Sequence, residues 1–182
     1  MNNNTLTYHD DVESIGWFDT PSDMDTIKRI VFPSSVKEIK KEAFKEMEAL
    51  EEVVFSEGLE SIGNRAFADC PRLKELIFPQ GLGNIYGNAF SGCTSLERVA
   101  IHPGTQEINI WDEAFANCTN LREVELDDTL DYTSFRLNVF ENTAFLTELR
   151  KKDPLVVINN EIIDGKKYQG DLVIPDYVKG VN

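Results

Sequence analysis

An alanine–phenylalanine or valine–phenylalanine pair recurs along the chain at nearly constant spacing. Successive phenylalanines of these pairs are 23, 23, 25 and 25 residues apart. No single helix or strand has a period of this length, so the spacing indicates an array of repeats in which each copy buries its apolar face against its neighbours. Such arrays usually form long binding surfaces, which directs the search for function toward binding. The pairs are Ala43–Phe44, Ala66–Phe67, Ala89–Phe90, Ala114–Phe115 and Val139–Phe140.

Alignment on these phenylalanines reveals four more apolar columns shared by five copies, which in the first copy are Ile30, Phe32, Ile39 and Leu50. A degenerate copy precedes the five, because residues 6–16 align with residues 53–63 at an offset of 47. Its back half, through Trp17 and Phe18, lacks the alanine–phenylalanine pair. Residues 1–149 are therefore predicted to form a solenoid of about six copies.

Each copy is expected to contain a strand, a turn, a second short extended segment and a short helical turn. The strand residues Val53 and Phe55 are predicted to face inward and Val54 outward. The segment from Ala66–Phe67 to Leu73 spaces its apolar residues three apart, which suits one helical or 3-10 turn. The predicted fold class is an α/β repeat solenoid of the leucine-rich-repeat type, with short parallel strands on the concave face and short helical or 3-10 turns opposite.

The repeat pattern lapses after Leu146. Residues 150–171 contain two β-rich runs with turn residues around Asn159–Asn160 and at Asp164–Gly165, which predicts an inserted β-hairpin. Residues 172–182 match the opening of a further copy and stop before any alanine–phenylalanine pair. We therefore expect the parent protein to carry further repeats.

The repeat consensus is a strand that often ends in proline, then isoleucine, Ala–Phe, cysteine and leucine. In this pattern, residues 57–73 and 79–96 resemble the BspA-like leucine-rich repeat proteins. Two-residue expansions before Phe115 and Phe140, and Met47 and Thr143 at the cysteine position, depart from it. The resemblance implies a surface or secreted protein of bacteria or protists, in a family linked to adhesion and host-protein binding.

The charge of the chain argues against some classes of partner. The sequence has 32 acidic and 18 basic residues, a formal net charge of −14. A nucleic-acid partner would need basic grooves, and an anionic membrane surface is disfavoured for the same reason. The acidity fits either simple solubility or a partner with a basic patch.

The location of the protein is left open by the sequence. No apolar run is long enough for a transmembrane helix, so we expect no membrane insertion. The first residues lack the basic and apolar regions of a signal peptide, which keeps a cytoplasmic location open. The family resemblance implies instead the cell surface or the extracellular space.

Few residues are candidates for chemistry. Cys70, Cys93 and Cys118 share one repeat position without any CxxC pair, which favours a packed core column over a metal or redox site. The two histidines, His9 and His102, are separated by several copies, which gives a nucleophile–base pair little to build on. A calcium site remains an alternative interpretation of the acidic cluster Asp127, Asp128 and Asp131. We expect no catalytic residues, no metal, no cofactor and no enzymatic activity.

The outward positions of the predicted strands are the candidate binding site. They form a charged row beside a mainly apolar row, and exposed contiguous apolar surface often marks a partner site. Strand propensity alone is the alternative explanation of the apolar row. We predict a non-enzymatic binding module for a protein, such as an extracellular-matrix or host protein, or for a glycan; an intracellular protein-interaction scaffold is the alternative. The candidate residues are Arg29, Val31, Glu52, Val54, Glu75, Ile77, Arg98, Ala100, Glu123 and Glu125.

Overall fold

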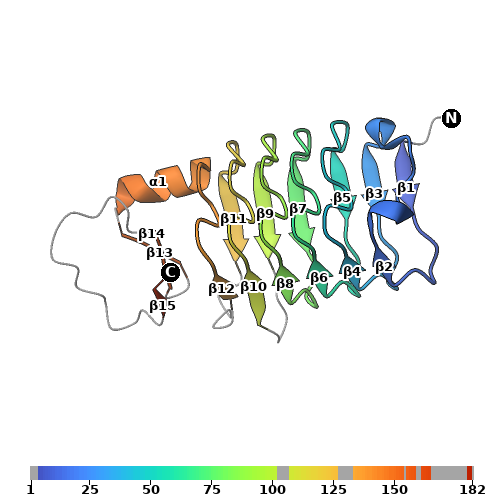
Figure 1. The fold of residues 1–182 in the computed structure, drawn as a ribbon. Helices are drawn as coiled ribbons and strands as arrows, with labels where there is room; N and C mark the ends of the chain where they lie inside the picture. Colours follow the sequence, from blue (N-terminus) through green and yellow to red (C-terminus); the bar gives the residue numbers. More distant parts are fainter. Residues whose placement is uncertain are drawn as a thin grey trace.

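The chain winds into a solenoid of parallel strands, as the repeat predicts (Figure 1). The computed structural model describes residues 4–101, 107–126, 133–153, 155–158, 161–164 and 180–181. Each coil of the solenoid contributes one strand to each of two rows, and the apolar columns lie between the rows.

The first row contains the strands expected from the Val-Val-Phe type of segment. Its neighbours are parallel and paired in the register of the sequence repeat, for example Ile30 with Val53 and Leu76 with Val99. The row is divided into two three-stranded sheets, with strand order β1-β3-β5 and β11-β9-β7. The strands are β1 (Thr5–Thr7), β3 (Arg29–Val31), β5 (Glu52–Val54), β7 (Glu75–Phe78), β9 (Arg98–Ile101) and β11 (Glu123–Leu126).

The second row is one continuous parallel sheet of six strands. The predicted column of isoleucines ends each short strand, and Ile39, Ile62 and Ile85 have no exposed surface. Period-two alternation explains this, because the preceding residue of each strand faces out and the isoleucine faces the core. The strands are β2 (Ser14–Ile15), β4 (Glu38–Ile39), β6 (Ser61–Ile62), β8 (Asn84–Ile85), β10 (Ile108–Ile110) and β12 (Thr133–Phe135).

The alanine–phenylalanine segments are runs of turns and not regular helices, so the prediction of helical or 3-10 turns at these positions is confirmed only in part. Each turn has two residues in the left-handed region, such as Arg65 (φ 56°) and Asp69 (φ 60°). The N–H groups alternate between two kinds of partner. Phe67 N–H donates to the Ala89 carbonyl of the next coil at 2.8 Å, whereas Ala66 N–H donates to the Gly63 carbonyl of its own turn at 3.1 Å. Apolar residues three apart suit a run of turns as well as a helix, and the coil-to-coil bonds favour the turns. The α/β description therefore holds only in part.

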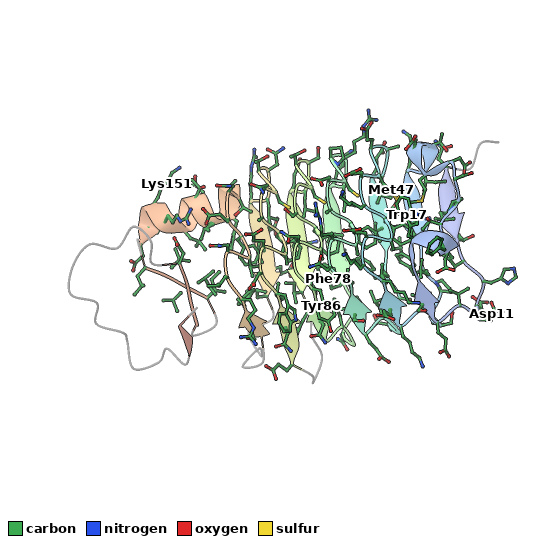
Figure 2. The ribbon with its side chains drawn as sticks, in the orientation of Figure 1. Asp11, Trp17, Met47, Phe78, Tyr86 and Lys151 are labelled. Atoms are coloured by element: carbon green, nitrogen blue, oxygen red, sulfur yellow. The ribbon has the colours of Figure 1, made fainter. Side chains whose placement is uncertain are left out.

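The phenylalanines form a continuous aromatic stack through the core. Ring centroids of Phe44, Phe67, Phe90, Phe115 and Phe140 follow one another at 5.1, 5.3, 5.5 and 5.8 Å, and the rings are nearly parallel. None of these five side chains has exposed surface. A second aromatic column from the first strand row packs against this stack, with Phe78 visible inside the coils in Figure 2. The predicted aromatic spine is confirmed.

Helices occur where the repeat pattern is lost. Two 3-10 helices, η1 (Trp17–Asp19) and η2 (Met24–Thr26), occupy the degenerate first copy. The α-helix α1 (Ala144–Lys152), which the sequence reading did not anticipate, follows the last coil. The Thr143 hydroxyl caps it by accepting a 3.1 Å hydrogen bond from Leu146 N–H, and basic residues in its last turn suit the negative end of the helix dipole.

Two strands of the predicted hairpin are present beyond this helix. β13 (Val156–Ile158) and β14 (Glu161–Asp164) pair antiparallel, and β15 (Gly180–Val181) pairs parallel with β14. The hairpin boundaries at 150 and 171 stay a prediction. Most of the expected incomplete copy at residues 172–182 lies outside the described residues.

A partly buried ion triad ties α1 to the hairpin. The Arg150 guanidinium bonds the Asp164 carboxylate at 2.5 Å and the Glu141 carboxylate at 3.0 Å. The Asp164 side chain is only 3% exposed, so the Arg150 guanidinium compensates a carboxylate that is largely removed from water.

Emptying one position of the aromatic stack is expected to destabilise the array. Phe67→Ala should lower the free energy of unfolding by about 3–5 kcal/mol, because it removes a fully buried ring and leaves a cavity between two coils. Urea denaturation followed by circular dichroism measures this. Phe18→Ala is the matched control, since that ring is 97% exposed, and it should change stability by less than about 0.5 kcal/mol. Equal effects of the two variants would contradict the assignment of the core.

Removing the Arg150 guanidinium should open the C-terminal hairpin. Arg150→Met removes the guanidinium from the buried Asp164 carboxylate, and breaking a buried ion pair in this way costs about 3–5 kcal/mol in comparable cases. Amide hydrogen exchange of β14 should become faster while exchange in β4 to β8 stays unchanged. Lys151→Met is the control, because its ion pair with Glu148 is exposed and should matter little. Unchanged exchange of β14 in the Arg150 variant would refute the role of the triad.

Candidate binding surface

The outward residues of the first strand row form a single surface, which we call the strand face. It comprises the exposed side of β3, β5, β7, β9 and β11. Register pairing places Arg29 beside Glu52, and Arg98 between Glu75 and Glu123. Two residues further along each strand, Val31 lies beside Val54 and Ile77 beside Ala100. The two predicted rows therefore face the same side, since residues two apart on a strand share a face. The concave curvature expected of this face stays a prediction.

Ion pairs between neighbouring coils cover much of the charged row. Arg29 bonds Glu52 at 2.8 Å, and Lys28 bonds Glu51 at 3.0 Å just outside the row. The Lys28 ammonium, by its hydrogen bond and its charge, lowers the pKa of Glu51. These pairs are solvent-exposed and add little to stability, so their main effect is to set the local charge pattern.

Arg98 is the most heavily paired residue of the strand face. Its guanidinium bonds the carboxylates of Glu75 and Glu125 and lies 3.5 Å from that of Glu123. The hydrogen bonds to Glu75 and Glu125 raise the pKa of Arg98. Four of the ten predicted site residues are thus joined in one network.

The apolar stripe is shorter than the sequence predicts. Ile77 is 54% exposed and Val31 and Val54 are partly exposed, but Ala100 has no exposed surface. The expectation that Ala100 is exposed is wrong. Glu125 is the register partner of Ala100, and Arg98 lies two residues before Ala100 on the same face, so the small methyl group lies beside the Arg98–Glu125 ion pair.

The cysteines line the core. Cys70, Cys93 and Cys118 are free and fully buried, and each thiol donates to the carbonyl of a stacked phenylalanine, at 3.3, 3.2 and 3.2 Å. Hydrogen bonding with the Cys93 thiol and then burial raise the pKa of Cys70, and burial is the main cause for Cys93. Raised thiol pKa values mean little thiolate, which agrees with packing rather than reactivity.

The other sequence candidates contribute no site to the described structure. His9 is exposed on the first coil. His102 and the three aspartates Asp127, Asp128 and Asp131 lie outside the described residues. Within the described part of the chain, no three histidine, cysteine or acidic side chains are grouped to hold a metal ion. None of the described helices has the length and apolar character needed to cross a bilayer.

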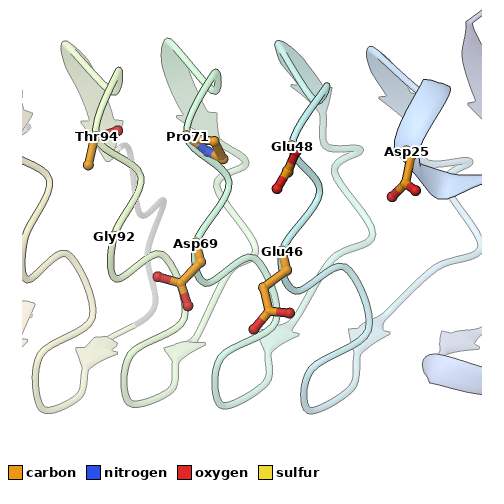
Figure 3. Close-up of a pocket in the computed structure, with 7 residues that line it drawn as sticks. All are labelled: Asp25, Glu46, Glu48, Asp69, Pro71, Gly92 and Thr94. Atoms are coloured by element: carbon orange, nitrogen blue, oxygen red, sulfur yellow. The ribbon is translucent and has the colours of Figure 1, made fainter.

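An acidic groove lies on the turn side of the solenoid, away from the strand face (Figure 3). Its volume is about 580 Å³, and four carboxylates of successive coils line it. Figure 3 shows the Glu46 and Asp69 side chains projecting from equivalent turns of adjacent coils. Lys45 lowers the pKa of Glu46 by a hydrogen bond and by its charge. The groove adds to the negative surface of the array without bringing an acid–base pair together.

Sequence reading missed two groups of exposed aromatic residues. Trp17 and Phe18 of η1 are 60% and 97% exposed. On the second strand row, Tyr86 stacks on Trp111 at 5.8 Å, and the Arg136 guanidinium lies 5.3 Å from the Trp111 ring. Figure 2 shows Tyr86 at this edge of the solenoid. Tyr86, Trp111 and Arg136 each follow the isoleucine or phenylalanine that ends a short strand. Aligning the position after that residue as a further column would have found them.

The comparisons with known proteins agree with this architecture. The model of the BspA type leucine-rich repeat region matches residues 22–147 and 104–180, with six copies. The chain belongs to this family. A search of proteins with curated functions found no match.

Solved structures of bacterial leucine-rich repeat proteins are similar to the chain. A leucine-rich cell surface protein from Faecalibacterium prausnitzii A2-165 is 29% identical over 70% of this chain, with a TM-score of 0.59. The chain spans only 33% of the length of that protein. The T. pallidum leucine-rich repeat protein is 26% identical over 82% of this chain and 69% of its own length, with a TM-score of 0.65. A protein from Eubacterium ventriosum ATCC 27560, 20% identical over 79% of this chain and 44% of its own length, shares the fold at a TM-score of 0.63.

The cysteine column predicts a thiol-reactivity test. At about pH 8, near the ordinary pKa of a free thiol, the native protein should react very slowly with Ellman's reagent, because the thiols are buried and Cys70 and Cys93 have raised pKa values. In concentrated urea all three should react at once. Rapid labelling of the native protein would contradict the core position of this column.

Proposed function

We propose that the protein is a non-enzymatic binding module that presents its strand face to a protein or a glycan, at the cell surface or outside the cell. The observation that carries the proposal is the strand face itself, where Ile77 and its apolar neighbours stay exposed beside a row of paired charges. Exposed apolar surface on an otherwise well-packed protein is typical of a partner site.

The family supports binding over catalysis. Repeat solenoids build extended surfaces from equivalent positions in successive coils, and the strand face is such a surface. The placement at the cell surface draws support from the similar F. prausnitzii protein, which is named a leucine-rich cell surface protein. Extracellular-matrix proteins, other host proteins and glycans are the proposed partner classes.

A charge substitution on the strand face tests the proposal. The protein would be screened by biolayer interferometry against a panel of immobilised extracellular-matrix proteins and glycans. For each ligand that binds, Val54→Asp with Ile77→Asp should weaken affinity by about tenfold or more, because two carboxylates replace the exposed apolar contact.

The control adds the same charge elsewhere. Thr94→Asp with Thr119→Asp places two carboxylates at exposed positions on the turn side and should leave binding unchanged. Thermal unfolding of both double variants checks that each is folded. Retained binding in a folded strand-face variant, or no binding to any member of the panel, would contradict the proposal.

A further inference from the structure

The strand face contains a split between β5 and β7. These strands are in contact, yet they belong to separate sheets, and no strand pairing joins them in the described structure. One coil earlier, Glu51 N–H and Glu52 N–H donate to the Lys28 carbonyl at 2.8 and 3.0 Å. The equivalent bonds from Lys74 and Glu75 to the Glu51 carbonyl are missing from this described region.

The split is confined to the strand face. Behind it, β6 and β8 pair through Ser61 with Asn84 and Ile62 with Ile85. On the turn side, Phe67 N–H bonds the Ala89 carbonyl at 2.8 Å. The same two coils are therefore joined on two sides and open on the third, which makes the split a local feature of the surface.

Like charges oppose each other at the split. Along the charged row, Arg29 faces Glu52, and Arg98 faces both Glu75 and Glu123, so opposite charges meet at those steps. Only the step between Glu52 and Glu75 places two carboxylates side by side among the described positions of this row. Each carboxylate forms an ion pair with the arginine of its other neighbouring strand, Glu52 with Arg29 and Glu75 with Arg98. Like charges on neighbouring strands are destabilising, which agrees with the loss of strand pairing here.

The split opens onto apolar side chains of the core. A pocket of about 430 Å³ lies at this position. Phe55 in its floor is partly exposed, whereas the equivalent Phe32 and Phe78 are 3% and 2% exposed. Val54 and the 54% exposed Ile77 form its apolar walls. Three glutamates and one lysine also line the pocket, and the three carboxylates are ion-paired with Lys28, Arg29 and Arg98 beside it.

We propose that the pocket between β5 and β7 seats an arginine side chain of a basic protein partner. The inference rests on the proposed function of the strand face and identifies the group that it recognises. The aliphatic stem of an arginine matches Val54 and Ile77. Its guanidinium, which has only donors, matches Glu52 Oε1 and Glu75 Oε2, the carboxylate oxygens that the bonds from Arg29 and Arg98 do not use. In this described region, the Glu51 carbonyl lacks bonds from Lys74 and Glu75 N–H of the kind that its equivalent one coil earlier accepts. It is therefore a further acceptor for the guanidinium. The net charge of −14 favours approach of a basic partner.

A small arginine analogue tests the proposed arginine-binding pocket, which we call the arginine seat, without a known protein partner. N-acetyl-arginine methylamide would be titrated into the ¹⁵N-labelled protein, with the lysine and citrulline analogues as comparisons. Chemical-shift changes should concentrate on amides of β5 and β7. The arginine probe should bind best, because citrulline lacks the charge and lysine lacks the planar set of donors. No localised shifts, or equal binding of either analogue, would overturn the proposal.

Variants that remove equal charge at different places separate specific binding of arginine in the pocket from general electrostatic attraction to the acidic protein. Glu52→Gln with Glu75→Gln should weaken the arginine probe by about tenfold or more, since two charge-assisted hydrogen bonds are lost. Glu38→Gln with Glu60→Gln removes the same charge at exposed positions in β4 and just before β6, and it should leave affinity unchanged. An equal loss in both double variants, or in neither, would overturn the seat.

Amide exchange tests the split itself. The Lys74 and Glu75 amides should exchange faster than those of Glu51 and Glu52, which are bonded to the Lys28 carbonyl. Equally slow exchange would show that β5 and β7 pair in solution and would overturn the proposal.

The panel ligands distinguish failure of this inference from failure of the proposed function. If Val54→Asp with Ile77→Asp abolishes binding of a panel protein but Glu52→Gln with Glu75→Gln does not, the strand face binds without an arginine seat. If neither pair of substitutions affects binding, the strand face is not the site. Loss of protein binding in both supports the seat, whereas binding only of neutral glycans contradicts it.

Discussion

Backbone hydrogen bonding between successive coils is the constraint on which the rest of this structure depends. It joins the second strand row and the turns coil after coil, as in the bonds from Phe44 to Ala66 and from Phe67 to Ala89. Strands bonded in this way are about 4.8 Å apart, so equivalent side chains must stack directly on one another. Columns of identical residue type follow, and the sequence shows them as a repeat. Gly63 illustrates the closeness of the coils, since a Cβ there would lie 2.6 Å from the backbone of Lys40.

The same constraint explains the turns and the packing behind them. A helical turn would direct all its N–H groups back along its own axis. Here the N–H groups of the left-handed residues Arg65 and Asp69 donate to the next coil, while Ala66 N–H donates within its own turn. Non-glycine residues in this conformation carry a cost, which the regular bonds to the next coil offset at each repeat. Small residues such as Ala66 lie where the coils meet, and the neighbouring phenylalanines fill the centre.

Residues whose role depends on position in the repeat could be predicted from the sequence, and residues whose role depends on a particular neighbour could not. Phe67 and Cys70 are buried because every copy buries that position, so alignment alone located them. The apolar spacing of the turn segment does not specify backbone dihedrals, which is why a helical turn was predicted there. Ala100 was expected to be exposed, and the ion pair beside it depends on rotamers of Arg98 and Glu125. The adjacent glutamates Glu52 and Glu75 were visible in the row, but their meaning required the pairing register.

A repeat array makes departures from its own pattern informative about function. Features that all coils share, such as the phenylalanine stack, are explained by folding and do not distinguish one surface position from another. The split at β5 and β7 differs, because two coils that pair normally at β6 and β8 lose pairing only on the strand face. Glu52 and Glu75 therefore weaken strand pairing next to the exposed side chain of Ile77. Stability does not require two carboxylates and an exposed isoleucine at this place. A cation with an apolar stem would contact both.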